Sequence, residues 1–172
     1  MKWLKLALSA AILAAAGIAI RYVCYRPVRC HDLTTRVAMQ MKDMDQWGDP
    51  TRVTVATREN LARLEPCRRE MPWNVNLQML VAANYGAREM HEDAIRVYED
   101  ALRYDHRPEL YFNLGIERLK TGRVDEAIEP LAVACSIRTD LITEILNIDV
   151  RARVMKLIDQ RATLLRLPNE PR

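Results

Sequence analysis

The sequence predicts an all-α protein built from antiparallel helical hairpins, and three observations predict this class. Helix-forming Ala, Leu, Arg, Glu and Met dominate, whereas glycine is scarce and no stretch alternates as a half-buried strand would. Hydrophobic residues make up 49% and charged residues 28% of the 172 residues, the range of a chain that folds around a core. One stretch also repeats at a period typical of stacked two-helix units.

The repeat lies in residues 75–140. Ala94 and Ala101 of its first half recur as Ala127 and Ala134, 33 positions later in both cases. Each half carries two helical patterns, and a period of this length is typical of helical hairpins that stack into a solenoid. We therefore predict two hairpin units at the centre of the chain.

Local signals place four helices in these two units. Asn74 has the side chain to cap the first helix, Pro108 suits the first turn of the third, and Gly122 can adopt the left-handed conformation that ends it. The predicted helices are Val75 to about Arg88, His91 to about Tyr104, Glu109 to Lys120, and Asp125 to about Ile137.

The segments on either side carry weaker versions of the pattern. Residues 32–72 are predicted as a degenerate hairpin, in which Pro66 bends or ends the second helix. Pro27 predicts a linker over residues 25–31, because proline disfavours a helix that continues through it. Residues 141–167 are predicted as C-terminal capping helices, since the open end of a helical stack needs a cap with one polar face.

Small and large apolar residues recur at fixed sites of the repeat. Leu114 and Gly115 form a large-small pair, and the first unit fills the matching sites with Val81, Ala82, Tyr85, Ala94, Tyr98 and Ala101. This pattern resembles the tetratricopeptide repeat family, and with the apolar N-terminus it looks like the short membrane-anchored bacterial type. The resemblance implies a short right-handed solenoid. Two departures are Arg118, where an aromatic is usual, and a first unit one residue short, while Pro130 inside a helix is a third oddity.

An apolar run, Leu6 to Ile20, opens the chain. Residues 1–24 are predicted either as a signal anchor that spans the bilayer or as a signal peptide cleaved near Ala14-Ala15-Ala16. The anchor interpretation predicts a single-pass protein of the bacterial inner membrane, with the repeat domain on the periplasmic side. The alternative is a protein secreted after signal cleavage.

Charge and motif content argue against several function classes. The net charge of +3 comes from mixed basic and acidic residues, which does not predict a nucleic-acid-binding face. His31, His91 and His106 fall at a predicted linker and two turns, without a positioned nucleophile or metal ligands. We therefore expect no enzyme activity, no metal site and no cofactor.

The cysteines predict a different role. Cys30 and Cys67 lie at the edges of the first hairpin, where the two ends of an antiparallel pair meet. In an oxidising compartment these two residues would form a disulfide, and the alternative is that all the cysteines are free thiols. Cys135 falls on a packing position and is expected to be a small buried apolar residue.

The first helix of each unit is expected to line a concave groove that binds a protein or peptide segment. For Phe112, Ile116 and Leu119 the alternative is burial beneath the next helix. The resemblance places these residues in the groove: Asn76, Met79, Ala83, Gly86, Glu109, Phe112, Asn113, Ile116, Leu119 and Lys120.

Three functions follow from these patterns. The first is a non-enzymatic, membrane-tethered adaptor that mediates protein–protein interactions in the cell envelope. The second is an accessory subunit of machinery that assembles or exports envelope polysaccharide or lipid. The third is a structural module that associates with itself, because a short solenoid leaves open ends.

Overall fold

The structure is a computed structural model that describes residues 12–21, 26–44 and 46–165. These residues are helical or in short connections, and no strand occurs among them, so the predicted all-α class is confirmed for the described part. Residues 12–20 are helical. The elements that follow are α2 (Arg26–Met44), α3 (Pro50–Glu70), α4 (Val75–Gly86), α5 (His91–Ala101), α6 (Pro108–Lys120), α7 (Val124–Ile137), the 3-10 helix η2 (Thr139–Glu144) and α8 (Ile148–Leu165).

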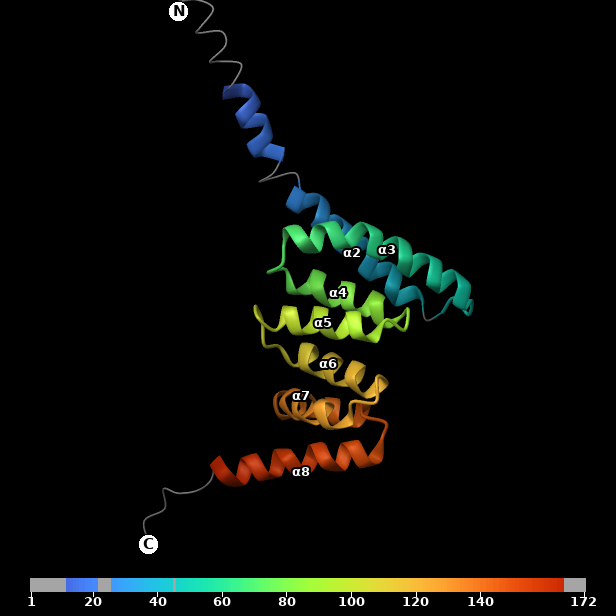
Figure 1. The fold of residues 1–172 in the computed structure, drawn as a ribbon, viewed down its shortest axis with the longest axis vertical. Helices are drawn as coiled ribbons and strands as arrows, with labels where there is room; N and C mark the ends of the chain where they lie inside the picture. Colours follow the sequence, from blue (N-terminus) through green and yellow to red (C-terminus); the bar gives the residue numbers. More distant parts are fainter. Residues whose placement is uncertain (1–11, 22–25, 45, 166–172) are drawn as a thin grey trace, which may run out of the picture.

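From α2 onward each helix packs against its neighbour in sequence, so the elements form one stack in chain order (Figure 1). Helix α6 lies between two apolar clusters. Leu110 and Leu114 belong to the cluster that extends through α5, α4, α3 and α2, whereas Phe112 belongs to the one formed with α7, η2 and α8. Both faces of α6 are therefore buried, and this helix joins the two halves of the stack.

Several helix ends form as their local sequence predicts. The Asn74 side chain accepts a hydrogen bond from the Leu77 N–H at 3.1 Å, which caps α4, and Pro108 opens α6. Gly122 has φ of +78°, the left-handed conformation that lets the chain leave α6. These positions depend only on neighbouring residues, and this explains why the sequence predicts them well.

The prediction of a linker over residues 25–31 is wrong, because α2 begins at Arg26 and runs without interruption to Met44. Pro27 lies in the first turn of α2. The backbone N–H groups of a first turn have no partner within the helix, so proline loses nothing there.

Pro66 does not end α3, which extends to Glu70. The last turn is secured by the Cys67 side chain, which forms a disulfide, and by the Cys67 carbonyl, which accepts the Met71 N–H at 2.9 Å. The disulfide and a local backbone hydrogen bond thus hold the helix past a residue that disfavours it.

Pro130 likewise lies inside α7, which continues to Ile137. A proline at position 130 cannot donate to the carbonyl of Glu126, four residues earlier. Arg118 of α6 donates to that carbonyl at 2.8 Å and forms an ion pair of 2.8 Å with Glu99 of α5. The two unusual residues of the repeat therefore compensate one another, because the guanidinium satisfies the carbonyl that the proline leaves without a helical partner.

The predicted membrane segment, residues 1–24, lies for the most part outside the described residues. Within the part of the chain that the structure describes, no helix combines the length and the apolar character required to cross a membrane.

Candidate functional site

The candidate site on α4 consists of residues with intermediate exposure. Met79, Ala83 and Gly86 are half-buried, and Asn76 near the start of the helix is exposed. Met79 also packs against the first apolar cluster. The predicted groove residues of this helix thus have partly accessible side chains, and the accessible surface is mainly apolar.

On α6 the predicted residues divide into two groups. Phe112 is only 8% exposed and lies in the second apolar cluster, so the expectation that it lines an open groove is wrong for this residue. The reason is that α7 and the elements after it cover this face of α6. Ile116 and Leu119 pack against the same cluster but remain half-buried, as do Glu109 and Asn113, and Lys120 is exposed.

Polar contacts connect the first turns of α4 and α6 to the connections beside them. Arg107 donates to the Asn76 side chain at 2.8 Å and also pairs with Asp105. Arg138 pairs with Glu109 at 2.8 Å. These contacts tie two of the predicted groove residues, Asn76 and Glu109, into the fold.

The carboxyl groups along this edge are held in their charged form. The pKa of Glu109 is lowered by a hydrogen bond from its own backbone N–H and by Arg138. The pKa of Asp105 is lowered by the hydrogen bond from Arg107, and that of Asp140 by Arg138. Such shifts are expected for carboxylates that accept hydrogen bonds from guanidinium groups, and they accompany a structural edge rather than an acid–base centre.

Glu117 is a buried charged residue that the sequence analysis did not identify. It is 7% exposed, and its carboxylate lies 2.7 Å from His91 Nδ1 and 2.8 Å from Lys120 Nζ. A Cβ atom added to Gly86 would lie 2.9 Å from Glu117 Oε1, so the glycine makes room for the carboxylate. Two predicted groove residues, Gly86 and Lys120, therefore contact the buried Glu117.

His91 is not a freely solvated turn histidine, because it opens α5 and contacts Glu117. Helical spacing is the signal that could have found this cluster. Leu110, Leu114 and Glu117 recur at intervals of four and three residues, and all three are buried.

Tyr98 packs next to the same cluster and is 4% exposed. Burial raises its pKa well above the usual value and the charge of Glu117 raises it further, whereas a hydrogen bond with Asn113 acts in the opposite direction. Asn113 thus has an internal partner as well. This tyrosine stays protonated at any physiological pH and has the contacts of a packing residue.

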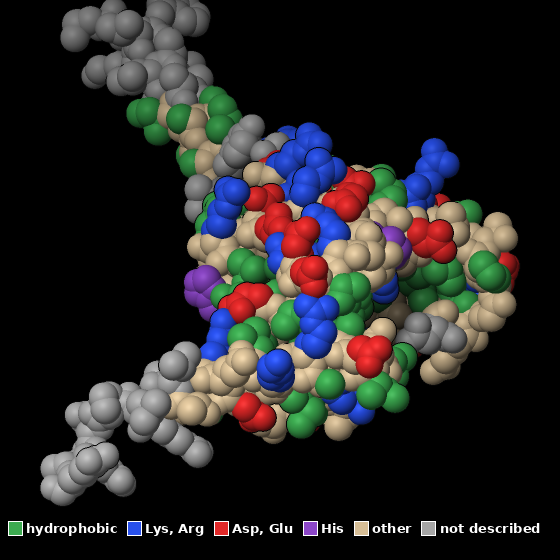
Figure 2. Space-filling model, turned by 60° about the horizontal axis from the view of Figure 1, so that its bottom comes forward, with side chains coloured by type: hydrophobic (Ala, Val, Ile, Leu, Met, Phe, Trp, Pro, Cys, Tyr) green, Lys and Arg blue, Asp and Glu red, His purple; other side chains and the backbone are tan. Residues whose placement is uncertain are grey.

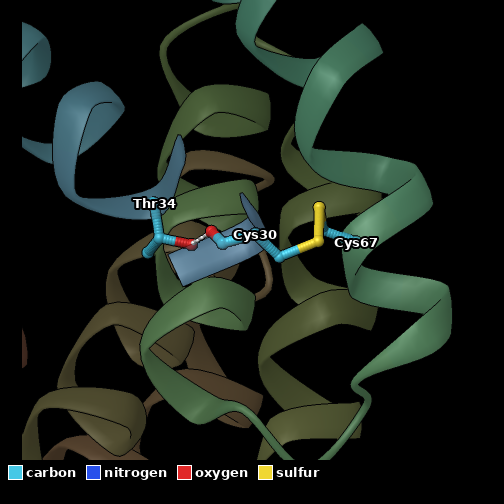
Figure 3. Close-up of a disulfide and its surroundings, with 3 residues drawn as sticks. All are labelled: Cys30, Thr34 and Cys67. Atoms are coloured by element: carbon cyan, nitrogen blue, oxygen red, sulfur yellow. Dashed lines mark hydrogen bonds between the residues drawn. A yellow bond between two sulfur atoms is a disulfide. The ribbon is translucent and has the colours of Figure 1, made fainter. Parts of the chain in front are cut away.

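The two cysteines of the first hairpin form a disulfide, with Cα atoms 5.7 Å apart (Figure 3). Both residues are nearly buried, and the Thr34 hydroxyl donates to the Cys30 carbonyl at 2.7 Å. The bond joins α2 to α3. Cys135 is a buried free thiol, in the position expected for a small apolar residue.

None of the His, Cys, Asp and Glu side chains of the described residues gather in groups of three or more that could hold a metal ion. Lys and Arg side chains lie among Asp and Glu side chains on the face that Figure 2 shows, with hydrophobic side chains between them.

Hollows on the described part lie away from the predicted groove. One is beside the disulfide between α2 and α3, two are along α8, and two smaller ones lie at the turn between α2 and α3 and beside Tyr85. The hollow between η2 and α8 is lined mainly by apolar side chains and has a volume of about 500 Å³. No pattern in the sequence predicts this hollow.

Comparison of the chain with models of known protein families finds no match, and comparison with curated protein sequences finds none either.

Proposed function

We propose that this chain is a non-enzymatic adaptor whose hairpins form a short solenoid of the tetratricopeptide type and bind a protein or peptide segment. The observation that carries the proposal is the burial of the small residues of the repeat. Each of these has 0% exposure and lies where two helices meet: Ala82, Ala94, Ala101, Ala127 and Ala134. Small residues at such positions let helices of a hairpin approach closely, as the repeat pattern requires.

Gly115 supports the same proposal. A Cβ atom added to Gly115 would lie 2.5 Å from Leu131 Cγ and 3.3 Å from the carbonyl oxygen of Ala127. The approach of α6 to α7 therefore depends on the absence of a side chain, at the small position of the large-small pair.

The proposed binding surface comprises the accessible residues of the first helix of each unit. Met79 and Ile116 are two of its apolar members, and both are half-buried because they pack against the apolar clusters. An apolar surface with a few polar residues suits a peptide in extended or helical form. Two alternatives are an accessory role in envelope polysaccharide or lipid export and self-association through the open ends of the stack.

The cellular location of the chain is also a proposal. The apolar run before Arg21 supports a tether in the bacterial inner membrane, with the stack on the periplasmic side. A disulfide between Cys30 and Cys67 supports an oxidising compartment. Cleavage after Ala16 with secretion is the alternative, and mass spectrometry of the N-terminal peptide from the mature protein decides between the two.

The test of the groove is affinity capture of the full chain from membrane extracts, comparing wild type with Met79→Glu and Ile116→Glu. Each variant places a charge on the proposed surface without removing a fully buried side chain. We expect loss of the partners that co-purify with wild type, while circular dichroism shows unchanged helicity.

A matched control is Val55→Glu, which makes the same kind of change at an exposed apolar residue of α3 outside the groove. The control variant should retain the partners. Recovery of the same partners with all three variants would show that the groove does not bind them.

A further inference from the structure

The hollow beside the disulfide lies between α2 and α3, at the end of the stack nearest the N-terminal segment (Figure 1). Its volume is about 570 Å³, within the range of pockets that bind small molecules. Arg21, the last described residue of the N-terminal segment, lines it together with residues of α2 and α3. The hollow is therefore next to the part of the chain that is predicted to enter the bilayer.

One wall of the hollow is apolar and held in place covalently. The disulfide between Cys30 and Cys67 lines it, as do the buried Val37 and the half-buried Leu33. Ala62 of α3 adds a small exposed side chain to the same lining. Such a wall suits the glycerol and the first acyl carbons of a lipid, which a hydrated ion would leave uncovered.

The charged residues of the lining are mainly basic. They are four arginines and two acidic residues: Arg21, Arg29, Arg36, Arg63, Asp32 and Glu70. Asp32 pairs with Arg36 at 2.7 Å. Within the described residues the side chains of Arg21, Arg29 and Arg63 form no ion pair. The lining therefore has positive charge that its own acidic residues do not compensate.

The same charge bias extends over the first hairpin. Helices α2 and α3 carry nine Lys and Arg residues and five Asp and Glu residues, whereas the chain after residue 70 carries 14 and 16. Glu59, one turn before Arg63 on α3, lines a separate hollow together with Arg52. The end of the stack nearest the predicted membrane segment is thus its basic end, and basic residues next to a bilayer attract anionic lipids.

We propose that this hollow binds the headgroup of an anionic phospholipid of the bilayer that holds the N-terminal segment. Arg29 of α2 and Arg63 of α3 donate to the phosphate oxygens, since a planar guanidinium matches the geometry of phosphate. The glycerol of the lipid lies against Leu33 and Ala62. The proposal rests on the proposed membrane tether and adds to it the class of lipid that the first hairpin recognises.

Native mass spectrometry of the full chain in a neutral maltoside detergent tests the site. The chain is mixed with equal amounts of phosphatidylglycerol and phosphatidylcholine, which differ in headgroup charge. We expect bound phosphatidylglycerol to exceed bound phosphatidylcholine about fivefold or more. Inorganic phosphate at millimolar concentration should not displace the lipid, because it has no apolar part to contact the wall. Displacement by phosphate would show a general anion site and overturn the lipid assignment.

The charge variant is the double substitution Arg29→Gln and Arg63→Gln. It should lower phosphatidylglycerol binding about tenfold and leave phosphatidylcholine binding unchanged. The matched control is Arg58→Gln with Lys156→Gln, which removes the same charge at two exposed residues outside the hollow. The control should change phosphatidylglycerol binding less than about twofold.

The blocking variant is Ala62→Trp, because an indole at this exposed residue of the lining would fill the hollow. It should weaken phosphatidylglycerol binding about tenfold or more. Ala38→Trp, at an exposed residue of α2 outside the hollow, is its matched control and should change binding less than about twofold. The charge variant keeps the test decisive if the tryptophan perturbs α3.

The outcomes separate this proposal from the functions proposed above. Weaker binding with the charge and blocking variants but not with their controls supports the site, whatever the groove variants at Met79 and Ile116 do. Equal binding of the two lipids by wild type, or equal effects of the variants and their controls, overturns it. A missing N-terminal peptide in the mature protein argues against the tether alone, because lipid binding by the full chain is measured without it.

Discussion

The hairpins α2/α3 and α6/α7 are held together in two different ways. In α2/α3, long helices of 19 and 21 residues are joined by the disulfide between Cys30 and Cys67. In α6/α7, shorter helices of 13 and 14 residues meet at Gly115, where Leu131 occupies the space a side chain would need. The first hairpin depends on a covalent link, and the second depends on close packing.

This difference separates two sources of stability. A disulfide acts mainly on the unfolded chain by reducing its conformational freedom, whereas packing at a glycine gives dispersion and hydrophobic contacts in the folded state. The stability of α2/α3 should therefore depend on redox conditions, and that of α6/α7 on the volume of a few side chains.

The largest effect is expected from removing the disulfide. A link between residues 37 positions apart contributes about 4 kcal/mol by the chain-entropy relation. Replacing Cys30 and Cys67 with Ser should lower the unfolding free energy of α2/α3 by that order, with faster amide exchange there than in α6 and α7. Hydrogen exchange by mass spectrometry measures this, and reductant should reproduce the effect in wild type only. If the amides of α2 and α3 exchange equally fast with and without the disulfide, the first hairpin does not depend on its covalent link.

Gly115→Val tests the packed hairpin. Its side chain would overlap Leu131, and overpacking of this kind costs up to about 3 kcal/mol of unfolding free energy. Chemical denaturation gives the value. In a Leu131→Ala background the same substitution should cost much less, because the alanine vacates the space. If Gly115→Val costs the same unfolding free energy in both backgrounds, the contact with Leu131 is not the cause of the loss.

Arg118 and Pro130 provide a smaller test within the same hairpin. Arg118→Ala should cost about 1.5–2 kcal/mol, since it removes charge-assisted hydrogen bonds to Glu99 and to the Glu126 carbonyl. In a Pro130→Ala background the backbone N–H at position 130 is restored, and the cost of losing Arg118 should fall by about half. The double-mutant cycle measures this coupling, which is absent if the guanidinium does not compensate the proline.

The smallest effect concerns the contact that joins the first hairpin to α4. The Tyr85 hydroxyl donates to Glu65 Oε1 at 2.8 Å, and Tyr85→Phe should cost about 1 kcal/mol at pH 7. Burial, with the hydrogen bond to Glu65, raises the pKa of Tyr85 to about 12. The folded state then keeps a proton that the unfolded state releases near pH 10, so stability falls between pH 10 and 12.

Urea unfolding at pH 7, 10 and 11 checks this prediction. The Tyr85→Phe variant should lose unfolding free energy less steeply above pH 10 than wild type. Both proteins retain the contribution of Tyr98 to this loss, but the variant has no hydroxyl at position 85 to release a proton. Parallel pH profiles would show that Tyr85 does not carry this part of the alkaline response.

The sequence predicted the fold best where the signals were local. The cap at Asn74 and the turn at Gly122 depend on side chains a few residues away, and both form. Prolines were interpreted less well because their effect depends on context. Pro27 lies in a first turn, and Pro130 is compensated by a residue of another helix, which no single-helix pattern contains.

The site was predicted less completely for related reasons. Periodicity placed Phe112 on the correct helix but could not tell that later elements would cover it. Glu117 was missed because charged residues are seldom buried, although its spacing from Leu114 marks the buried face. The hollow at α8 is lined by residues of α7, η2 and α8 together, an arrangement that no pattern within a single helix predicts.

Because α2 begins as early as Arg26, the connection between the N-terminal segment and the helical stack is short. The four residues 22–25 separate the helical residues before them from Arg26, and the five Cα–Cα steps from residue 21 to residue 26 cover at most about 18 Å. If the N-terminal segment is held in a bilayer as proposed, the start of α2 lies within that distance of the lipid surface. At the opposite end of the stack, α8 then lies farther from the membrane (Figure 1).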